Sequence, residues 1–562
     1  MKGKFLTLFA TIFVLSGLIF AACQPAAATE APVVEETAAA TEAPAATEAA
    51  ATEAPAATEA AVATEAPAGD MTITYMDTTG FYTLDPFGTP WFTLTQAVMY
   101  DTLVQILPDG SAYEGILAES WEPSEDGLAI TFKLKDGITF HDGTPWNADA
   151  AVWNLSKFLD PAWPKTINED WASVISSFEK VDDMTIKINF ISVYSPIYAD
   201  LALTYMVSPT AYEELGSDNF GASPVGTGPW MPIEIVPNDH VTYQKNPNYT
   251  WGASYTNGQP AAADFFKIVF NTDQAVAYAA LETGEVTFTD LGAQFLASAE
   301  ENPDIEVNKG TSNSLYYLGI NYKKEIFQNA DFRRAIAFAL DRDEIIAAAF
   351  EGEAFKTCQF LPGGTIGYNA ETDAYACEKY PYDPEQANQI LDDLGWVDTN
   401  GDGVRERDGA ELTFPMIFNT ETTTGLAAEV IQSQLADIGI ALDLQPMEAA
   451  AQAEILVAEQ QDFFIRPYGL VDPVILSSMV TYPNRNAFDD PQATELRNIA
   501  DSKLDFAERM QAVDNMNRYL IDNNSWFPLW TPYAYVASRA ELQGEMFDFV
   551  GGIIFHNATI TK

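Results

Sequence analysis

The chain of 562 residues carries 81 acidic and 28 basic side chains, and its net charge at neutral pH is -53. A surface this acidic repels phosphate backbones and anionic lipid head groups, so it excludes nucleic acid as a partner and charge as a means of membrane attachment. The sequence has three histidines and no P-loop, nucleophile elbow or paired-histidine metal motif, so it predicts neither catalysis nor a cofactor.

The amino terminus has the pattern of an export signal. Lys2 and Lys4 precede an apolar run over residues 5–22, and Cys23 follows that run. A charged segment, an apolar segment and a cleavage site predict a lipoprotein signal peptide over residues 1–22. Residues 20–23, Phe-Ala-Ala-Cys, resemble a lipobox, which implies that Cys23 is lipidated and begins the mature chain. An uncleaved anchor helix is the alternative, although the run is short for a membrane span.

A segment of low complexity separates this signal from the rest of the chain. Residues 23–70 are nearly all Ala, Thr, Glu and Pro, and TEAPAATEAA recurs in them. Such a composition buries too little apolar surface to fold, and its prolines interrupt any helix. We therefore predict a disordered tether over residues 23–70. Residues 71–562 are numerous enough to form a large core and two lobes.

The first folded segments mix strands and helices. Residues 72–76 alternate like a strand, and residues 94–107 favour a helix. Three Asp-Gly pairs, at residues 126–127, 136–137 and 142–143, then place Gly where a tight turn needs positive φ. Between them residues 130–135 alternate apolar and polar, which predicts a meander. Asn147 is the expected N-cap of a helix that runs to about Leu159.

The later segments become more helical. Residues 185–190 alternate like a strand, and residues 195–205 predict a helix or an ordered loop. Asp341 with Glu344 resembles a capping box, and a helix begins at Pro384 and ends at Gly395. Residues 426–438 predict a helix that stops at Gly439, and residues 440–444 predict a strand. This helix-strand unit suits a parallel sheet and a distinct lobe.

Several collinear motifs resemble one known family. Residues 118–160 contain the Asp-Gly meander, residues 224–230 read PVGTGPW and residues 245–249 read KNPNY. Further on, residues 281–286 read LETGEV and residues 331–342 read DFRRAIAFALDR. From about Met71 to near Lys562 these blocks resemble the family 5 solute-binding proteins of ABC importers, the dipeptide, oligopeptide and nickel-binding group.

The resemblance implies a fold and its division into lobes. The implied fold class is α/β, a two-lobe periplasmic-binding-protein-like fold of type II in its large family 5 variety, with a hinge between the lobes. Lobe 1 is expected over residues 71–318 and 531–562, including the meander as an extra subdomain, and lobe 2 over residues 319–530. The chain is expected to cross between lobes near residues 316–321 and 527–531, which permits closure over a ligand.

The resemblance also suggests regions of the ligand cleft. Trp91 and the segment over residues 466–473, with Tyr468 and Asp472, are expected there. For each aromatic residue core packing is the alternative role, and Asp472 before Pro473 also suits a structural turn. Peptide-binding relatives hold the ligand amine with an aspartate of this segment. In this chain that position falls on Gly469, which departs from the peptide pattern.

Two further groups of residues suggest local chemistry. With Cys23 assigned to lipid, Cys358 and Cys377 are expected to form a disulfide in an exported protein. Residues 398–409 resemble the first half of a calcium loop, with oxygen donors at Asp398, Asn400 and Asp402. Position twelve of that loop is Gly409 instead of a bidentate Glu. An Asp-Gly turn without bound metal is therefore the preferred interpretation.

These observations converge on transport. We expect a monomeric lipoprotein at the extracytoplasmic face of the membrane that captures a small solute, with a peptide favoured, and delivers it to an ABC permease and ATPase. Import components that bind an oligosaccharide or a metal chelate are alternatives within the family. An extracytoplasmic ligand sensor and a hydrolase on a borrowed fold are the alternatives from other classes.

Overall fold

The structure is a computed structural model, and it describes residues 70–89, 93–159, 171, 173–420, 424–481, 488 and 490–561. Cys23 and Trp91 lie outside these residues, as do the predicted signal peptide and all of the tether before Asp70. None of the helices in the described ranges is both long and apolar enough to cross a bilayer.

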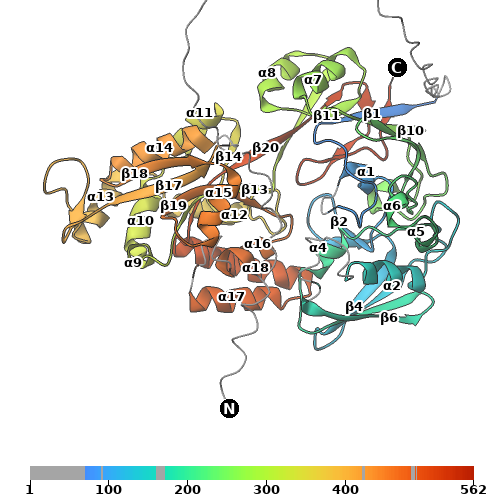
Figure 1. The fold of residues 1–562 in the computed structure, drawn as a ribbon, viewed down its shortest axis with the longest axis horizontal. Helices are drawn as coiled ribbons and strands as arrows, with labels where there is room; N and C mark the ends of the chain where they lie inside the picture. Colours follow the sequence, from blue (N-terminus) through green and yellow to red (C-terminus); the bar gives the residue numbers. More distant parts are fainter. Residues whose placement is uncertain are drawn as a thin grey trace, which may run out of the picture. The chain divides into compact units, whose positions relative to one another are not determined.

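One sheet of 12 strands runs through the described part of the chain. Its central path has the order β18-β17-β19-β13-β20-β11-β1-β10-β9-β8, and β12 and β14 also pair with β20. The long strand β20 (Phe527–Arg539) joins the two ends of this path. Its first half pairs with β13 (Ser314–Ile320) and β14 (Ala354–Lys356), and its second half with β11 (Phe288–Asp290) and β12 (Ile305–Thr311) (Figure 1).

Two large clusters of buried side chains lie on either side of this crossing. One cluster draws on residues 73–288 and 536–558, with Ile73 and Phe266 among them. The other draws on residues 315–530, with Phe464 and Trp530 among them. We call the half built around the first cluster lobe 1 and the half built around the second lobe 2. Both halves are α/β, as predicted.

Lobe 1 begins with the strand that the sequence predicts. In β1 (Thr72–Asp77) the buried side chains alternate over the first residues, and the strand pairs in parallel with β10 (Phe265–Phe270) and β11. Antiparallel strands β9 (His240–Lys245) and β8 (Trp230–Val236) complete this end of the sheet. Two helices, α7 (Gln274–Thr283) and α8 (Leu296–Glu301), pack on its strands through a smaller third cluster that includes Leu281.

The predicted meander supplies two strands, β4 and β5, of a separate sheet of four strands in lobe 1. The sheet has the order β4-β5-β7-β6, and Gly127, Gly137 and Gly143 have φ values of 69°, 79° and 81°. The side chain of Asn147 accepts a hydrogen bond from the Ala150 amide, which confirms it as the N-cap of the following helix. The bounds are β4 (Ala118–Pro123), β5 (Ala129–Leu134), β6 (Ile175–Asp182), β7 (Thr185–Phe190) and α2 (Ala148–Lys157).

The prediction of a helix over residues 94–107 is wrong. The helix α1 spans only Leu94–Ala97, and β2 (Val104–Ile106) follows it and pairs with β3 (Tyr113–Gly115). Long-range backbone partners take the groups that a helix would use. The Gly228 amide donates to the Met99 carbonyl at 3.0 Å, and the Met206 amide donates to the Asp101 carbonyl at 2.9 Å. Tertiary hydrogen bonds therefore override the local helical pattern.

Residues 195–205 contain the short helix α4 (Ile197–Leu201), and α5 (Pro209–Leu215) and α6 (Ser217–Phe220) follow. At its carboxyl end the chain returns to lobe 1 through short strand pairs. These pairs join β21 (Leu542–Gln543) with β24 (Thr559–Ile560), and β22 (Met546–Phe547) with β23 (Ile553–Ile554).

Lobe 2 contains the helix-strand unit that the sequence predicts. Helix α14 (Thr424–Ala436) ends before Gly439, whose φ is 80°, and β18 (Ala441–Met447) follows. β18 lies parallel to β17 (Thr413–Asn419), and β17 is also parallel to β19 (Phe463–Gly469). The chain reaches β19 through α15 (Ala449–Val457), so it crosses from one side of β17 to the other.

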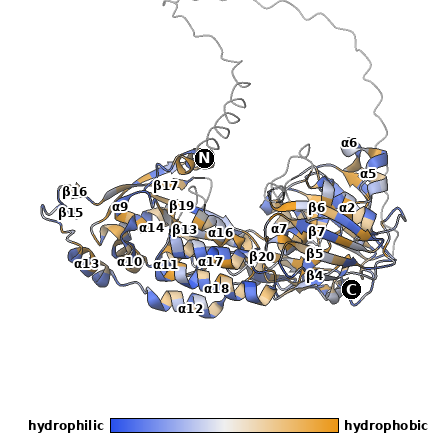
Figure 2. Ribbon diagram, turned by 90° about the horizontal axis from the view of Figure 1, so that it is seen from below, coloured by the Kyte–Doolittle hydropathy of each residue, from blue (hydrophilic) through white to orange (hydrophobic). Residues whose placement is uncertain are grey.

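The remaining helices of lobe 2 surround these strands. Asp341 caps α11 by accepting from the Asp343 and Glu344 amides, but its own amide donates to Gln434 instead of Glu344, so the capping box is half formed. Figure 2 shows hydrophilic and hydrophobic residues alternating along α12 and α18, as expected for helices with one buried face. The bounds are α9 (Glu325–Gln328), α10 (Ala330–Ala339), α11 (Arg342–Phe350), α12 (Ala370–Lys379), α13 (Pro384–Asp393), α16 (Val474–Thr481), α17 (Pro491–Asp501) and α18 (Phe506–Asp522).

Candidate functional site

The carboxyl ends of β17 and β19 form one candidate edge for ligand binding. β17 lies between β18 and β19 in the sheet. The chain passes from β17 to β18 and then returns to β19, on the other side of β17. In open α/β sheets ligands bind outside the carboxyl ends of the strands where the order reverses in this way. Asn419 ends β17 and Gly469 ends β19, so the predicted segment over residues 466–473 lies at this edge.

Tyr468 of this segment is buried. Its hydroxyl donates to the Phe360 carbonyl at 2.6 Å, and its ring meets that of Tyr317 at a centroid distance of 5.1 Å. Burial raises the pKa of the Tyr468 phenol well above its ordinary value, so the group stays protonated and donates. These contacts correspond to the packing role that the sequence leaves open for this aromatic residue.

Asp472 is held by an arginine from α18. Its two carboxylate oxygens accept from Arg509 Nη2 at 2.6 Å and Arg509 Nη1 at 2.7 Å, and both side chains are buried. One of these oxygens also accepts from the Val474 amide at 2.8 Å, at the start of α16. A ligand amine would therefore compete with a bidentate arginine for this carboxylate.

Gly469 lies where β13 and β19 approach too closely for a side chain. In β19 it pairs with Ser314 of β13, and a Cβ atom built on it would lie 2.4 Å from the Asn313 carbonyl oxygen. An aspartate at this position would force the two strands apart. The backbone that allows β13 and β19 to pair here therefore leaves no room for a side chain at Gly469.

A disulfide supports the same segment. Cys358 and Cys377 are joined with a Cα–Cα distance of 5.3 Å. The loop that follows Cys358 contacts residues 468–471 along its length. Thr365 Oγ1 donates to the Leu470 carbonyl at 2.9 Å, and the Ile366 amide donates to the Val471 carbonyl at 2.8 Å. The disulfide therefore fixes the loop against which the predicted cleft segment rests.

The calcium-like loop turns its oxygens toward its own backbone. Asp398 accepts from the Gly401 amide at 2.6 Å and from the Gly403 amide at 2.9 Å. Asp402 accepts from the Val404 amide at 2.9 Å. These are the bonds of an Asp-Gly turn. Within the described ranges no group of three or more His, Cys, Asp or Glu side chains is placed to hold a metal ion.

The lobes touch through α17 and α18 of lobe 2. The Ser195 amide, just before α4, donates to the Asp501 carbonyl at 3.3 Å. The ring of Tyr113 in β3 meets that of Phe506 at a centroid distance of 5.8 Å. The Tyr113 hydroxyl is buried and has no hydrogen-bond partner among the described residues. A buried donor without a partner favours a bound water or ligand group at this contact.

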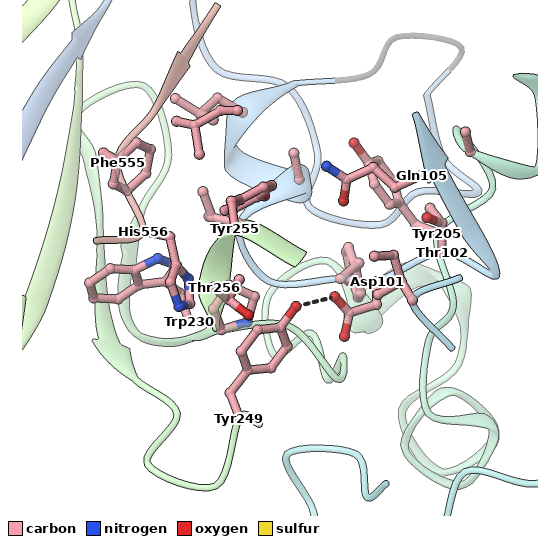
Figure 3. Close-up of a pocket in the computed structure, with 18 of the residues that line it drawn as sticks. Asp101, Thr102, Gln105, Tyr205, Trp230, Tyr249, Tyr255, Thr256, Phe555 and His556 are labelled. Atoms are coloured by element: carbon pink, nitrogen blue, oxygen red, sulfur yellow. Dashed lines mark hydrogen bonds between the residues drawn. The ribbon is translucent and has the colours of Figure 1, made fainter. Parts of the chain in front are cut away.

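A second candidate site is a pocket of about 230 Å³ that lies wholly in lobe 1 (Figure 3). It is formed by α1, the start of β2, the short helix η1 (Ser254–Thr256) and the carboxyl-terminal strand β23 with the residues that follow it. Aromatic rings dominate its wall, and the residues labelled in Figure 3 include Tyr205, Trp230, Tyr249, Tyr255, Phe555 and His556.

Asp101 is the carboxylate of this pocket. It is buried, and three neutral donors surround it: Thr227 Oγ1 at 2.9 Å, the Tyr249 hydroxyl at 2.9 Å and Trp251 Nε1 at 3.0 Å. Burial raises the pKa of the Asp101 carboxyl, and the three donors and Lys135 oppose that rise. Sequence reasoning missed Asp101, although two of its three donors, Thr227 and Tyr249, lie in the motifs at residues 224–230 and 245–249.

Two histidines stay neutral for the same physical reason. Burial lowers the pKa of His556, whose Nε2 donates to the Gln259 carbonyl at 2.9 Å. Burial also lowers the pKa of His141 to about 4, and its Nε2 donates to the Gly228 carbonyl at 2.9 Å. His141 therefore serves packing in the turn that carries Thr227, and His556 forms part of the pocket wall.

Comparison with known proteins identifies the family. The family model described as bacterial extracellular solute-binding proteins, family 5 (middle), matches residues 112–487. Among curated relatives, heme-binding protein A of Haemophilus influenzae is 26% identical over 84% of this chain and 88% of its own length. The oligopeptide-binding protein AppA of Bacillus subtilis is 24% identical over 76% and 80%. The glutathione-binding protein GsiB of Escherichia coli is 31% identical over 67% and 69%.

Solved structures share the fold. HbpA2 from Haemophilus parasuis superposes with a TM-score of 0.77 at 22% identity, over 87% of this chain and 100% of that one. NikA from Brucella suis, in complex with Fe(III)-EDTA, superposes with a TM-score of 0.73 at 21% identity, over 88% and 100%. The two-lobe fold predicted from the sequence is confirmed. The chain belongs to family 5 of the bacterial extracellular solute-binding proteins, which are transport binding proteins and not enzymes.

Proposed function

We propose that this protein captures a small solute between its two lobes and delivers it to a membrane permease, as the lipid-anchored binding component of an ABC importer. The observation that carries the proposal is the family match over residues 112–487. The reversal of strand order at β17 supports a ligand edge in lobe 2, and the pocket at Asp101 supports another in lobe 1.

In this proposal the lobes comprise residues 71–318 with 531–562 and residues 319–530. The hinge is proposed near residues 316–321 and 527–531, in β13 and the start of β20, whose buried side chains belong to the cluster of lobe 2. Tyr316 and Trp530 stack there at a centroid distance of 4.8 Å. Two neighbouring strands that cross together allow rotation about one line with small backbone changes. A solute that contacts both lobes would then shift the population toward the closed state.

The proposal keeps the expected route to the cell surface. Residues 1–22 serve as the signal peptide, Cys23 carries the lipid, and residues 23–70 let the monomeric folded part reach a permease and its ATPase from the extracytoplasmic face. The lack of Lys and Arg between Lys4 and Lys133 supports lipid, rather than charge, as the means of attachment. Replacement of Cys23 by Ser should release the protein from membranes into the soluble fraction.

The solute class is proposed from the relatives. A peptide is favoured because an oligopeptide-binding and a glutathione-binding protein are among them. A heme-binding protein is also among them, so the candidate solutes extend beyond peptides. Gly469 argues against an amine anchor at that position. Trp91 is kept as a proposed ligand contact, while Tyr468 and Asp472 are proposed to shape the cleft through their contacts with Phe360 and Arg509.

A thermal-shift screen of the purified full-length protein tests the proposal. Short peptides, oligosaccharides and nickel chelates are added at increasing concentration. A solute at 100 times its dissociation constant stabilises the folded state by about 2.7 kcal/mol, which is a readily measured shift in Tm. Stabilisation by one class identifies the solute. If a well-folded protein is stabilised by no solute of any class, the proposal of import fails.

A further inference from the structure

The pocket around Asp101 has a chemistry that the family membership does not specify. Among the described residues that line it, none is Lys or Arg. Asp101 itself receives hydrogen bonds from neutral groups alone, those of Thr227, Tyr249 and Trp251. The lining therefore offers no cationic group to a ligand anion, and its one carboxylate accepts no hydrogen bond from a cation.

Three carboxylates act on one phenol of the pocket. Glu114 and Asp548 act on Tyr255 together with Asp101, and all three oppose ionisation of its phenol. Lys135, a cation that acts on Asp101, donates to the backbone carbonyls of Gly115 at 2.8 Å and Trp251 at 2.9 Å. Its charge is shared between Asp101 and Glu114. The field inside the pocket is therefore negative, which attracts a positive group.

Aromatic rings provide the complementary surface for such a group. His556 packs near Tyr249 at a centroid distance of 5.9 Å and near Tyr255 at 6.4 Å. Trp230 meets Phe555 at 6.4 Å. Rings from three separate segments thus converge around one cavity (Figure 3). Aromatic faces stabilise an organic cation, whose apolar shell also favours burial.

The size of the cavity limits the ligand. Its volume of about 230 Å³ lies below the range of roughly 300–1,000 Å³ that is typical of pockets for drug-sized molecules. It suits a compact group rather than a whole peptide or a heme. We propose that this pocket binds a small organic cation, of the size of a trimethylammonium group, as the charged end of the transported solute.

This inference depends on the proposed function in one respect, because it takes the bound cation to be part of the transported solute. Binding of the cation itself needs lobe 1 alone, because every residue that lines the pocket comes from that lobe. Solute capture between the lobes can therefore be tested separately. A peptide or oligosaccharide that stabilises the protein without affinity for a cation would preserve the proposed function and remove this inference.

Calorimetric titration of the full-length protein provides the test. The probes are choline and 3,3-dimethyl-1-butanol, which has the same shape without the charge. The cation is expected to bind at least about tenfold more tightly than its neutral isostere, because the rings and the carboxylate act on its charge. Equal affinity for the two probes, or binding of neither, overturns the proposal.

Variants locate the binding in this pocket. Ala97 lines it at the exposed end of α1, and Ala97→Trp should fill it and weaken choline binding at least about tenfold. Ala279→Trp, at an exposed position of α7 away from the pocket lining, is the matched control and should leave the affinity unchanged. Equal affinities of the two variants contradict the assignment.

A second pair of variants tests the aromatic ring of Tyr255. Tyr255→Leu removes an aromatic face from the pocket, whereas Tyr82→Leu removes an exposed ring elsewhere in lobe 1. Only the first change should weaken choline binding, and it should leave the weak binding of 3,3-dimethyl-1-butanol nearly the same. An equal loss for both probes would show that the ring supplies shape and not attraction for charge, which overturns the cation assignment.

Discussion

Two buried aspartates, one in each lobe, have carboxylates that are stabilised by different kinds of partner. Asp472 in lobe 2 is paired with the guanidinium of Arg509, so two opposite charges are buried together. Asp101 in lobe 1 is surrounded by three neutral donors. The first arrangement pairs the charge with a cation in direct contact, whereas in the second all three hydrogen-bond donors to the carboxylate are neutral. The partner of a buried carboxylate therefore decides whether it is structural or available.

The supports beneath the two carboxylates also differ. A disulfide fixes the loop that contacts the Asp472 segment through Leu470 and Val471. In lobe 1 a neutral histidine, His141, contacts the two glycines that flank Thr227, a donor to Asp101. One support is covalent and the other depends on protonation. Variants can separate these contributions.

The largest expected effect comes from breaking the buried ion pair. Arg509→Met leaves Asp472 buried without its cation, and the free energy of unfolding should fall by about 3–5 kcal/mol. Urea denaturation measures the change. The double variant with Asp472→Leu as well removes the uncompensated charge and should regain much of the loss. If the double variant is no more stable than Arg509→Met, the loss of stability does not come from an unpaired charge on Asp472.

Removal of the disulfide should have the next effect. Replacing Cys358 and Cys377 by Ser opens a loop with a sequence separation of 19 residues, which should lower the free energy of unfolding by about 3 kcal/mol. The same change loosens the loop against the Asp472 segment, so the bound solute should dissociate faster. A variant with unchanged Tm and unchanged dissociation would contradict this support role.

Stability in acid should depend on His141. Its pKa falls to about 4 on folding because the ring is buried, while an unfolded histidine titrates near 6.5. The unfolded state therefore binds more protons between these values, and stability falls as pH falls from about 6.5 to about 4, by up to about 3 kcal/mol. His141→Gln should remove this part of the pH dependence. Parallel unfolding curves of the two proteins at pH 7 and pH 4.5 give the comparison.

The smallest expected effect on stability follows from neutralising the other carboxylate. Asp101→Asn replaces one acceptor oxygen by an NH2 group, which leaves at least one of the three buried donors unpaired, and the free energy of unfolding should fall by about 2 kcal/mol. The same variant should lose its preference for choline over the neutral isostere. Thermal unfolding and titration of one preparation measure both. A variant that keeps the preference would separate Asp101 from the negative field of the pocket.

The sequence predicts the features whose causes are local. Asn147 as an N-cap, the Asp-Gly turns and the helix stop at Gly439 each depend on a few adjacent residues, and each is found. The two-lobe fold follows from collinear motifs. The helix over residues 94–107 was not found beyond Ala97, because its backbone pairs with residues more than a hundred positions away.

The candidate site depends on partners that are distant in sequence. The donors Tyr249 and Trp251 lie 148 and 150 residues from Asp101, and no periodic pattern connects them. The resemblance pointed instead to Asp472, whose partner Arg509 lies 37 residues away on α18. Spacing alone could not show which of the two carboxylates is already paired with a cation.

Native mass spectrometry of the folded full-length chain tests the central claim most directly. The protein is mixed with a panel of peptides, oligosaccharides, nickel chelates and organic cations, and the bound species is then released and weighed. The account predicts a single adduct, one solute per chain, that is recovered chemically unchanged. No adduct with any solute, or recovery of an altered molecule, would contradict a solute-binding protein of import.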